Sequence, residues 1–198
     1  MHMDIILASK SPRRRALLEQ MGVRDFRILT PDIDEHMDRA LPPAELVRQI
    51  SLEKAQAVAA QADPNTVVIA ADTVVALDGA VLGKPADEEE AFRMLSLLSG
   101  NRHQVYTGLT VLRGEQVFSQ WEETAVTFRP LTAEEIEAYI ATGEPMDKAG
   151  AYGIQGYGSL LIEGISGDYY NVMGLPVCRL GQILGQLGMD CMALAAGR

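Results

Sequence analysis

The amino-acid sequence predicts an α/β fold, because segments with a strand pattern alternate with segments that have a helix pattern. Residues 4–9 and 66–71 are short apolar runs of the length of buried strands. Residues 43–61 instead place Leu46 and Ile50 four positions apart, on one face of a helix. A sheet covered by helices would bury both kinds of apolar surface.

Capping residues mark where the expected helices begin, since their side chains accept hydrogen bonds from the backbone of the first turn. Ser11 followed by Pro12 is the first such start, and Gly22 is the matching end. Two further starts have the spacing of a capping box, Asp87 with Glu90 and Thr132 with Glu135. The expected helices are residues 12–22, 43–61, 87–100, 132–142 and 177–187.

The expected strands follow from apolar runs and turn residues. Asp78-Gly79 has the chemistry of a hairpin turn after one such run. The expected strands are residues 4–9, 26–30, 66–71, 74–77, 105–112, 116–128 and 159–165. Neither a repeat nor a linker divides the chain, so we expect a single domain over residues 1–198.

Composition and charge exclude several classes of protein. Hydrophobic residues make up 47% and charged residues 22%, as in ordinary globular proteins, and no apolar run reaches the ~18–20 residues that span a membrane. A net charge of −10 disfavours binding to nucleic acid. The N-terminus lacks a signal-peptide pattern, and Cys178 and Cys191 lack metal-ligand spacing. We therefore expect a cytoplasmic protein that binds neither membrane nor nucleic acid.

Three arginines, Arg13, Arg14 and Arg15, occupy the first turn of the first expected helix. A helix N-terminus carries a positive partial charge, so cations are unfavourable there unless an anion binds. Backbone N–H groups and guanidinium groups would then both point at a phosphate. A solvated basic patch is the alternative, and these residues alone leave both interpretations open.

Two charged residues interrupt apolar patterns. Asp72 lies in an apolar run, just past an expected strand, where its carboxylate must be paired, bound to metal or shifted in pKa. An aspartate in a turn between two strands is the alternative. Lys54 lies on the apolar face of its helix, where a lysine either extends its amine to water or meets a phosphate.

Three further segments offer weaker signals. Gln155 lies in a glycine-rich segment, where it has the donor and acceptor needed to read a base edge, although a pair of turns explains the glycines equally well. Residues 79–84 (GAVLGK) lack P-loop spacing, and Pro85 replaces its Ser/Thr, but Lys84 remains a candidate phosphate contact. The acidic loop that contains Glu35 is usually just solvated, yet together with Asp72 it has the oxygens for a hard cation.

Taken in order, several motifs resemble the Maf family, and they cover nearly the whole chain. They are residues 8–14 (ASKSPRR), 34–35 (DE), 53–55 (EKA), 71–75 (ADTVV), 83–85 (GKP), 103–108 (HQVYTG), 147–156 (DKAGAYGIQG) and 167–176 (GDYYNVMGLP). The resemblance implies a mixed sheet with flanking helices, similar to that of inosine-triphosphate pyrophosphatases, in two lobes around a central cleft. It also implies dependence on a divalent cation, Mg²⁺ or Mn²⁺, a homodimer, and a link to septum formation.

Three positions distinguish branches of the family. Arg13, Thr73 and Gln155 resemble the branch that acts on dTTP and UTP. The resemblance therefore implies a nucleoside-triphosphate pyrophosphatase that releases the monophosphate and pyrophosphate, with these three residues setting substrate specificity.

The residues and the resemblance lead to one hypothesis of mechanism. Asp72 activates a water molecule, Glu35 assists the metal, and the triphosphate is bound by Ser9 and by a set of cations, Arg13, Arg14, Lys54 and Lys84. A non-catalytic regulator of cell division that senses nucleotides is the alternative hypothesis. Release of pyrophosphate distinguishes the two, because a sensor binds without turnover.

Overall fold

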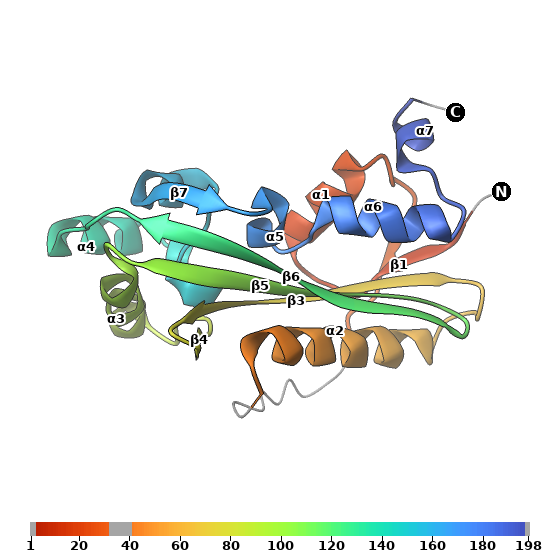
Figure 1. Cartoon of the computed structure of the whole chain (residues 1–198), viewed down its shortest axis with the longest axis horizontal. Helices are drawn as coiled ribbons and strands as arrows, with labels where there is room; N and C mark the ends of the chain where they lie inside the picture. The colour runs from red at the N-terminus through yellow and green to blue at the C-terminus, as the bar shows by residue number, and fades with distance from the viewer. Residues whose placement is uncertain (1–2, 32–40, 197–198) are drawn as a thin grey trace.

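The computed structural model describes residues 3–31 and 41–196. Within these residues the fold is α/β, with one mixed sheet that has helices on both faces (Figure 1). The strands are β1 (Ile5–Leu7), β2 (Arg27–Ile28), β3 (Val67–Leu77), β4 (Ala80–Leu82), β5 (Arg102–Arg113), β6 (Gln116–Phe128) and β7 (Ile162–Ser166). The helices are α1 (Pro12–Gln20), α2 (Pro43–Ala59), α3 (Glu88–Leu98), α4 (Ala133–Ala141), α5 (Tyr169–Met173), α6 (Val177–Gln186) and α7 (Cys191–Ala195). Three 3₁₀ helices precede β7: η1 (Glu144–Asp147), η2 (Ala149–Ala151) and η3 (Gly156–Leu161).

Strand order in the sheet is β2-β1-β3-β5-β6-β7, with β4 paired to the far end of β3. β1 runs parallel to β2 and β3, and every other pair is antiparallel. The sequence therefore predicted the class correctly, and the sheet is mixed as the resemblance implied.

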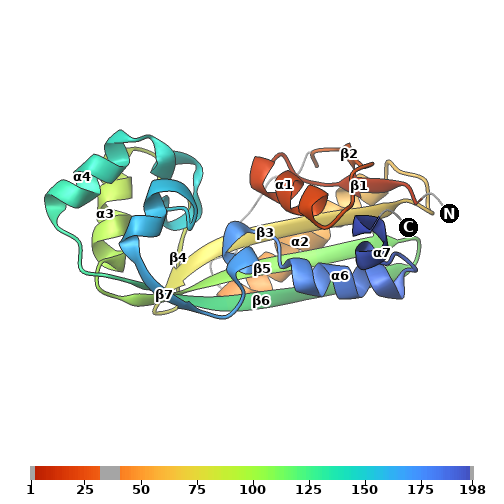
Figure 2. The same cartoon turned by 90° about the horizontal axis from the view of Figure 1, so that it is seen from above.

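Helices gather at the two ends of the long strands and form two lobes (Figure 2). In the first lobe, α1 and α6 cover one face of the sheet and α2 covers the other (Figure 1). In the second lobe, α3 and α4 pack with the 3₁₀ segments around a separate apolar cluster that includes Phe128 and Leu95. β3, β5 and β6 extend through both lobes, so the backbone of one sheet joins the two cores.

Helix starts were predicted well, because they depend on neighbouring residues. The side chain of Ser11 accepts from the Arg14 N–H, and that of Asp87 accepts from the Glu90 N–H. Thr132 and Glu135 form both hydrogen bonds of a capping box. The expected helix ends are also close to the observed ones.

The central strand differs from the prediction. Residues 66–71 and 74–77 were expected to be two strands, but β3 is continuous from Val67 to Leu77, and Asp72 lies opposite Gly108 of β5. Asp72 is therefore not in a turn or past a strand end. Because β5 pairs with β3 from Val68 to Ala76, the hydrogen bonds between the two strands keep β3 continuous through a polar residue. The Asp78-Gly79 hairpin is confirmed, with positive φ at both residues.

Other elements lie outside the predictions. Residues 159–165 were expected to be one strand, but β7 starts only at Ile162, after η3. The short helices α5 and α7 were not expected, because five residues carry too little periodicity to be recognised. In the described residues, no helix combines the length and the apolar character that crossing a membrane requires.

Candidate functional site

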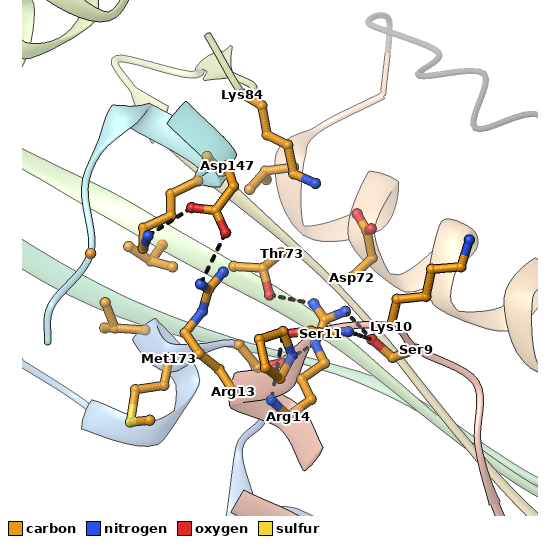
Figure 3. Close-up of a pocket in the computed structure, with 18 of the residues that line it drawn as sticks. Ser9, Lys10, Ser11, Arg13, Arg14, Asp72, Thr73, Lys84, Asp147 and Met173 are labelled. Atoms are coloured by element: carbon orange, nitrogen blue, oxygen red, sulfur yellow. Dashed lines mark hydrogen bonds and ion pairs between the residues drawn. The ribbon is translucent and has the colours of Figure 1, made fainter. Parts of the chain in front are cut away.

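A cleft of about 950 Å³ lies between the lobes and opens beside the middle of β3. Its walls come from residues 8–14, the centre of β3, Lys84 after β4, residues 144–156 and the end of α5 (Figure 3). The resemblance implied a central cleft of this kind.

The topology of the sheet places the cleft. β1 pairs with β3 as far as Ile69, and β4 pairs with the same edge of β3 only from Val75 onward. In the part of the chain that the structure describes, no strand covers this edge at residues 70–74. Asp72 and Thr73 therefore lie at an opening just beyond the carboxyl end of β1, and open α/β sheets bind ligands outside the carboxyl ends of their strands.

Alternation along β3 sends these two side chains to opposite faces. Asp72 shares the face of Val68 and Ala70, which pack under α2, and Thr73 shares the face of Ile69, which packs under α1 and α6. The cleft thus wraps around an open strand edge and receives side chains from both faces.

Lys54 of α2 meets Asp72 on the first face. Lys54 Nζ lies 2.7 Å from Asp72 Oδ1, and only 10% and 14% of the two side chains are exposed. Gly108 of β5 makes this approach possible, since a Cβ there would lie 2.0 Å from the Val47 carbonyl oxygen of α2. Lys54 is therefore directed inward, in an ion pair with Asp72, and its contact with a phosphate stays a prediction.

Arg14 meets Thr73 on the second face. Its guanidinium donates to the Gly174 carbonyl at 2.7 Å, to Thr73 Oγ1 at 3.0 Å and to Ser9 Oγ at 3.3 Å (Figure 3). Thr73 Oγ1 also lies 2.9 Å from Thr107 Oγ1. The Arg14 side chain thus joins three segments that are distant in sequence, around residues 9–14, 73 and 174, and holds Ser9 and Thr73 at the cleft wall.

Arg13 points across the cleft to the second lobe. Its Nη1 lies 3.6 Å from Asp147 Oδ2, and Asp147 Oδ1 accepts from Lys148 Nζ at 2.7 Å. Burial raises the pKa of Asp147, but the hydrogen bond and charge of Lys148 and the charge of Arg13 outweigh it and hold the pKa below its usual value. Asp147 and Lys148 belong to the 147–156 motif but were not predicted as site residues; an Asp-Lys pair opening a glycine-rich segment was the available signal.

Gln155 and Lys84 line the second-lobe wall, and both side chains are exposed. The Glu144 carboxylate organises the segment that carries Gln155, because it accepts from the Tyr157 and Gly158 N–H groups, each at 2.9 Å. The Gly150 N–H donates to the Gly83 carbonyl at 3.0 Å, which ties this segment to the residue before Lys84.

Of the predicted site residues, eight line the cleft: Ser9, Arg13, Arg14, Lys54, Asp72, Thr73, Lys84 and Gln155. Glu35, the predicted metal residue, lies outside the described residues. Among residues 3–31 and 41–196, no group of three or more His, Cys, Asp or Glu side chains is close enough together to hold a metal ion. Asp72 contributes one carboxylate, so an ion bound there would need further oxygens from another source.

Comparison with known proteins identifies the family. Residues 4–187 match the family described as "Maf-like protein". A protein from Symbiobacterium thermophilum named "dTTP/UTP pyrophosphatase" is 53% identical over 98% of this chain and 99% of its own length. One of the same name from Moorella thermoacetica is 52% identical over 94% of this chain and 96% of its own. A solved structure of a HAM1 protein from Coxiella burnetii aligns at 14% identity with a TM-score of 0.43, over 64% of this chain and 73% of that one. On its sequence, the chain belongs to the Maf family.

Proposed function

We propose that this protein hydrolyses dTTP and UTP to the nucleoside monophosphate and pyrophosphate. One observation carries the proposal: a carboxylate, Asp72, lies at an open strand edge in a cleft whose walls are lined by cations from both lobes. The family and the names of its near relatives support the substrate class.

Asp72 is proposed as the general base. Oδ1 is held by Lys54, and in the described part of the chain Oδ2 accepts no hydrogen bond, which leaves it for a water molecule. The water oxygen attacks the α-phosphorus and passes a proton to Asp72. The bond from the α-phosphorus to the bridging oxygen breaks, and pyrophosphate leaves. A positioned base of this kind contributes ~10²–10⁴-fold to a rate.

Phosphate binding is assigned to Ser9, Arg14, Lys54 and Lys84. The position and charge of these residues support the assignment. All four line the cleft, and three of them are cations in a chain whose net charge is −10. Cations that are already fixed in place stabilise developing phosphate charge without reorganising. Arg14 is fixed by hydrogen bonds to Ser9, Thr73 and Gly174.

Selection of the base is assigned to Arg13, Thr73 and Gln155. Arginine only donates hydrogen bonds, so it suits the keto oxygen of thymine or uracil and not the amino group at the same position of cytosine. Gln155 both donates and accepts, as a ring N–H beside a keto oxygen requires. The Thr73 hydroxyl is already engaged, because it accepts a hydrogen bond from Arg14 and shares one with Thr107. Thr73 is therefore proposed to influence base selection by setting the shape of the cleft wall.

A divalent cation, Mg²⁺ or Mn²⁺, is proposed as cofactor. Mg²⁺ in nucleotide enzymes is held by one or two carboxylates together with substrate phosphates and water. Asp72 at the cleft fits that donor set, and Glu35 is the proposed second carboxylate. When bound, the cation would neutralise charge on the phosphate oxygens.

We also propose that the two lobes form a single domain and that two chains associate as a homodimer. The domain proposal is supported by β3, β5 and β6, which extend through both lobes (Figure 2). A single calorimetric unfolding transition and a sedimenting mass of two chains are the expected results.

A panel of triphosphates tests the function. With Mg²⁺ or Mn²⁺, the protein should release pyrophosphate from dTTP and UTP faster than from CTP, ATP or 7-methyl-GTP. Equal rates would remove the specificity while leaving the pyrophosphatase activity. Binding of dTTP without any pyrophosphate release would favour the nucleotide-sensing regulator instead.

A further inference from the structure

We propose that Asp147 is a positioning residue for Arg13: its carboxylate reaches across the cleft and fixes the guanidinium that selects a keto pyrimidine. The inference rests on the proposed function and adds to it a residue from the opposite lobe. Figure 3 shows the contact, with Asp147 and Arg13 directed at each other from the two walls.

Asp147 is suited to this role because it bridges two cations. Oδ2 faces Arg13 at 3.6 Å, and Oδ1 accepts from Lys148 Nζ at 2.7 Å. Lys148 Nζ also donates to the Glu144 carbonyl at 2.6 Å. Lys148 of the second lobe therefore holds Oδ1 of Asp147, while Oδ2 faces Arg13 of the first lobe.

Lys148 is itself fixed by packing. A Cβ on Gly153 would lie 2.9 Å from Lys148 Cε, so the glycine leaves the space that the lysine stem fills. Only 16% of the Lys148 side chain is exposed. Lys148 is thus a packed support for Asp147, whose own side chain is 66% exposed.

Arg13 needs an anionic partner for an electrostatic reason. It lies in the first turn of α1, where the backbone N–H groups carry positive charge, next in sequence to Arg14. A guanidinium in such a field is repelled toward solvent. Asp147 offsets the repulsion from the opposite wall and holds Arg13 over the cleft.

Position matters because Arg13 discriminates by hydrogen bonding. A donor aligned with a keto oxygen favours UTP and disfavours CTP, whose amino group cannot accept. A displaced donor loses this preference even though its charge remains. Loss of Asp147 should therefore reduce discrimination between bases more than it reduces affinity for triphosphate.

The test measures dissociation constants by titration calorimetry with the α,β-methylene analogues of UTP and CTP, which are not cleaved. In Asp147→Asn, the CTP-to-UTP ratio of dissociation constants should fall about 2- to 5-fold, the range for losing one partly exposed charge pair. Affinity for the CTP analogue should stay equal or rise, because a negative charge near the polyphosphate is gone. Partial unfolding would lower the number of binding sites and leave the ratio unchanged.

Glu19→Gln is the matched control. Glu19 pairs with Arg15 at 2.9 Å on the same helix, and neither residue lines the cleft. This variant should keep the wild-type ratio. In an Arg13→Met background, Asp147→Asn should change the ratio no further, because the residue through which it acts is gone.

The inference is overturned by a wild-type ratio in Asp147→Asn, and equally by the same fold-change with and without Arg13. A wild-type protein that does not distinguish the two analogues would also overturn it. Pyrophosphate release from dTTP by the wild-type protein is scored separately, so failure of the proposed function is distinguishable from failure of the role of Asp147.

Discussion

Lys54 and Asp72 form an ion pair at the open edge of β3, with Nζ and Oδ1 2.7 Å apart and both side chains largely withdrawn from water. The lysine comes from α2 and the aspartate from the middle of the strand beneath it. This one contact both fixes the side chain of the proposed base and presents a cation to the cleft.

Replacing Lys54 by Met should reduce both activity and stability. Methionine fills the space of the lysine stem, but Asp72 loses its counter-ion in a site that is only partly hydrated. The free energy of unfolding should fall by about 1–3 kcal/mol, measured by urea denaturation. Activity on dTTP should be lost even where the variant is fully folded.

The double variant Lys54→Met/Asp72→Asn is the control for this prediction. It has no unpaired carboxylate, so it should recover much of the lost stability while remaining inactive. Near-normal kcat/KM in Lys54→Met would instead make Lys54 a structural residue and remove it from the proposed phosphate contacts.

Gly108→Ala should disrupt the approach of α2 to the sheet. The added methyl group would lie 2.0 Å from the Val47 carbonyl oxygen, which is backbone and cannot rotate away. We expect destabilisation of about 3 kcal/mol, at the upper end for overpacking, together with reduced activity because Lys54 moves with α2. Urea denaturation and pyrophosphate release measure the two effects.

Gly185→Ala is the matched glycine control. Gly185 lies in α6, is exposed, and has no atom within 4 Å of an added Cβ. Alanine is favoured over glycine in a helix, so this variant should be equal in stability to the wild type or more stable by about 0.5–1 kcal/mol. Destabilisation at both positions to the same degree would contradict the close-approach argument.

His103 should make the fold sensitive to acid. It is fully buried beside Tyr152, with Nε2 2.7 Å from the phenol oxygen, and burial lowers its pKa from 6.5 to about 4. Between these two pH values the unfolded chain binds a proton that the folded protein does not, so stability falls as the pH falls. Between pH 6.5 and 5, the wild type should lose about 2 kcal/mol more than His103→Gln does.

The comparison of urea denaturation curves for these two proteins isolates the histidine, because the chosen window lies above the usual range of carboxylates. Parallel pH dependence in the two proteins would show that His103 titrates normally. His103 is the second residue of β5, which begins at Arg102.

Local features of the fold were predictable, and long-range ones were not. Ser11, Thr132 and Glu135 act within one helical turn, so their spacing was enough to place helix starts. The continuity of β3 through Asp72 depends on its pairing with β5, more than 30 residues further along the chain. No local pattern specifies that pairing.

In the candidate site too, local features were predictable from the sequence and long-range contacts were not. The arginine cluster at Arg13 and Arg14 was visible as a local electrostatic conflict, and the cleft lies there. Its partners were not visible, because Asp147 approaches from the other lobe and Gly174 contributes only a backbone carbonyl. The family resemblance supplied the order of the motifs, and the fold brings them together around β3.

Asp72→Asn tests the central claim most directly, through the rate of pyrophosphate release from dTTP at saturating Mg²⁺. The substitution keeps the shape of the side chain and removes its basicity. We expect the rate to fall ~10²–10⁴-fold relative to wild type, the contribution of a positioned base. The α,β-methylene analogue of UTP should still raise the Tm of the variant, because loss of a negative charge does not weaken binding of a polyanion. Wild-type release of pyrophosphate by Asp72→Asn would contradict the account and its placement of the active site.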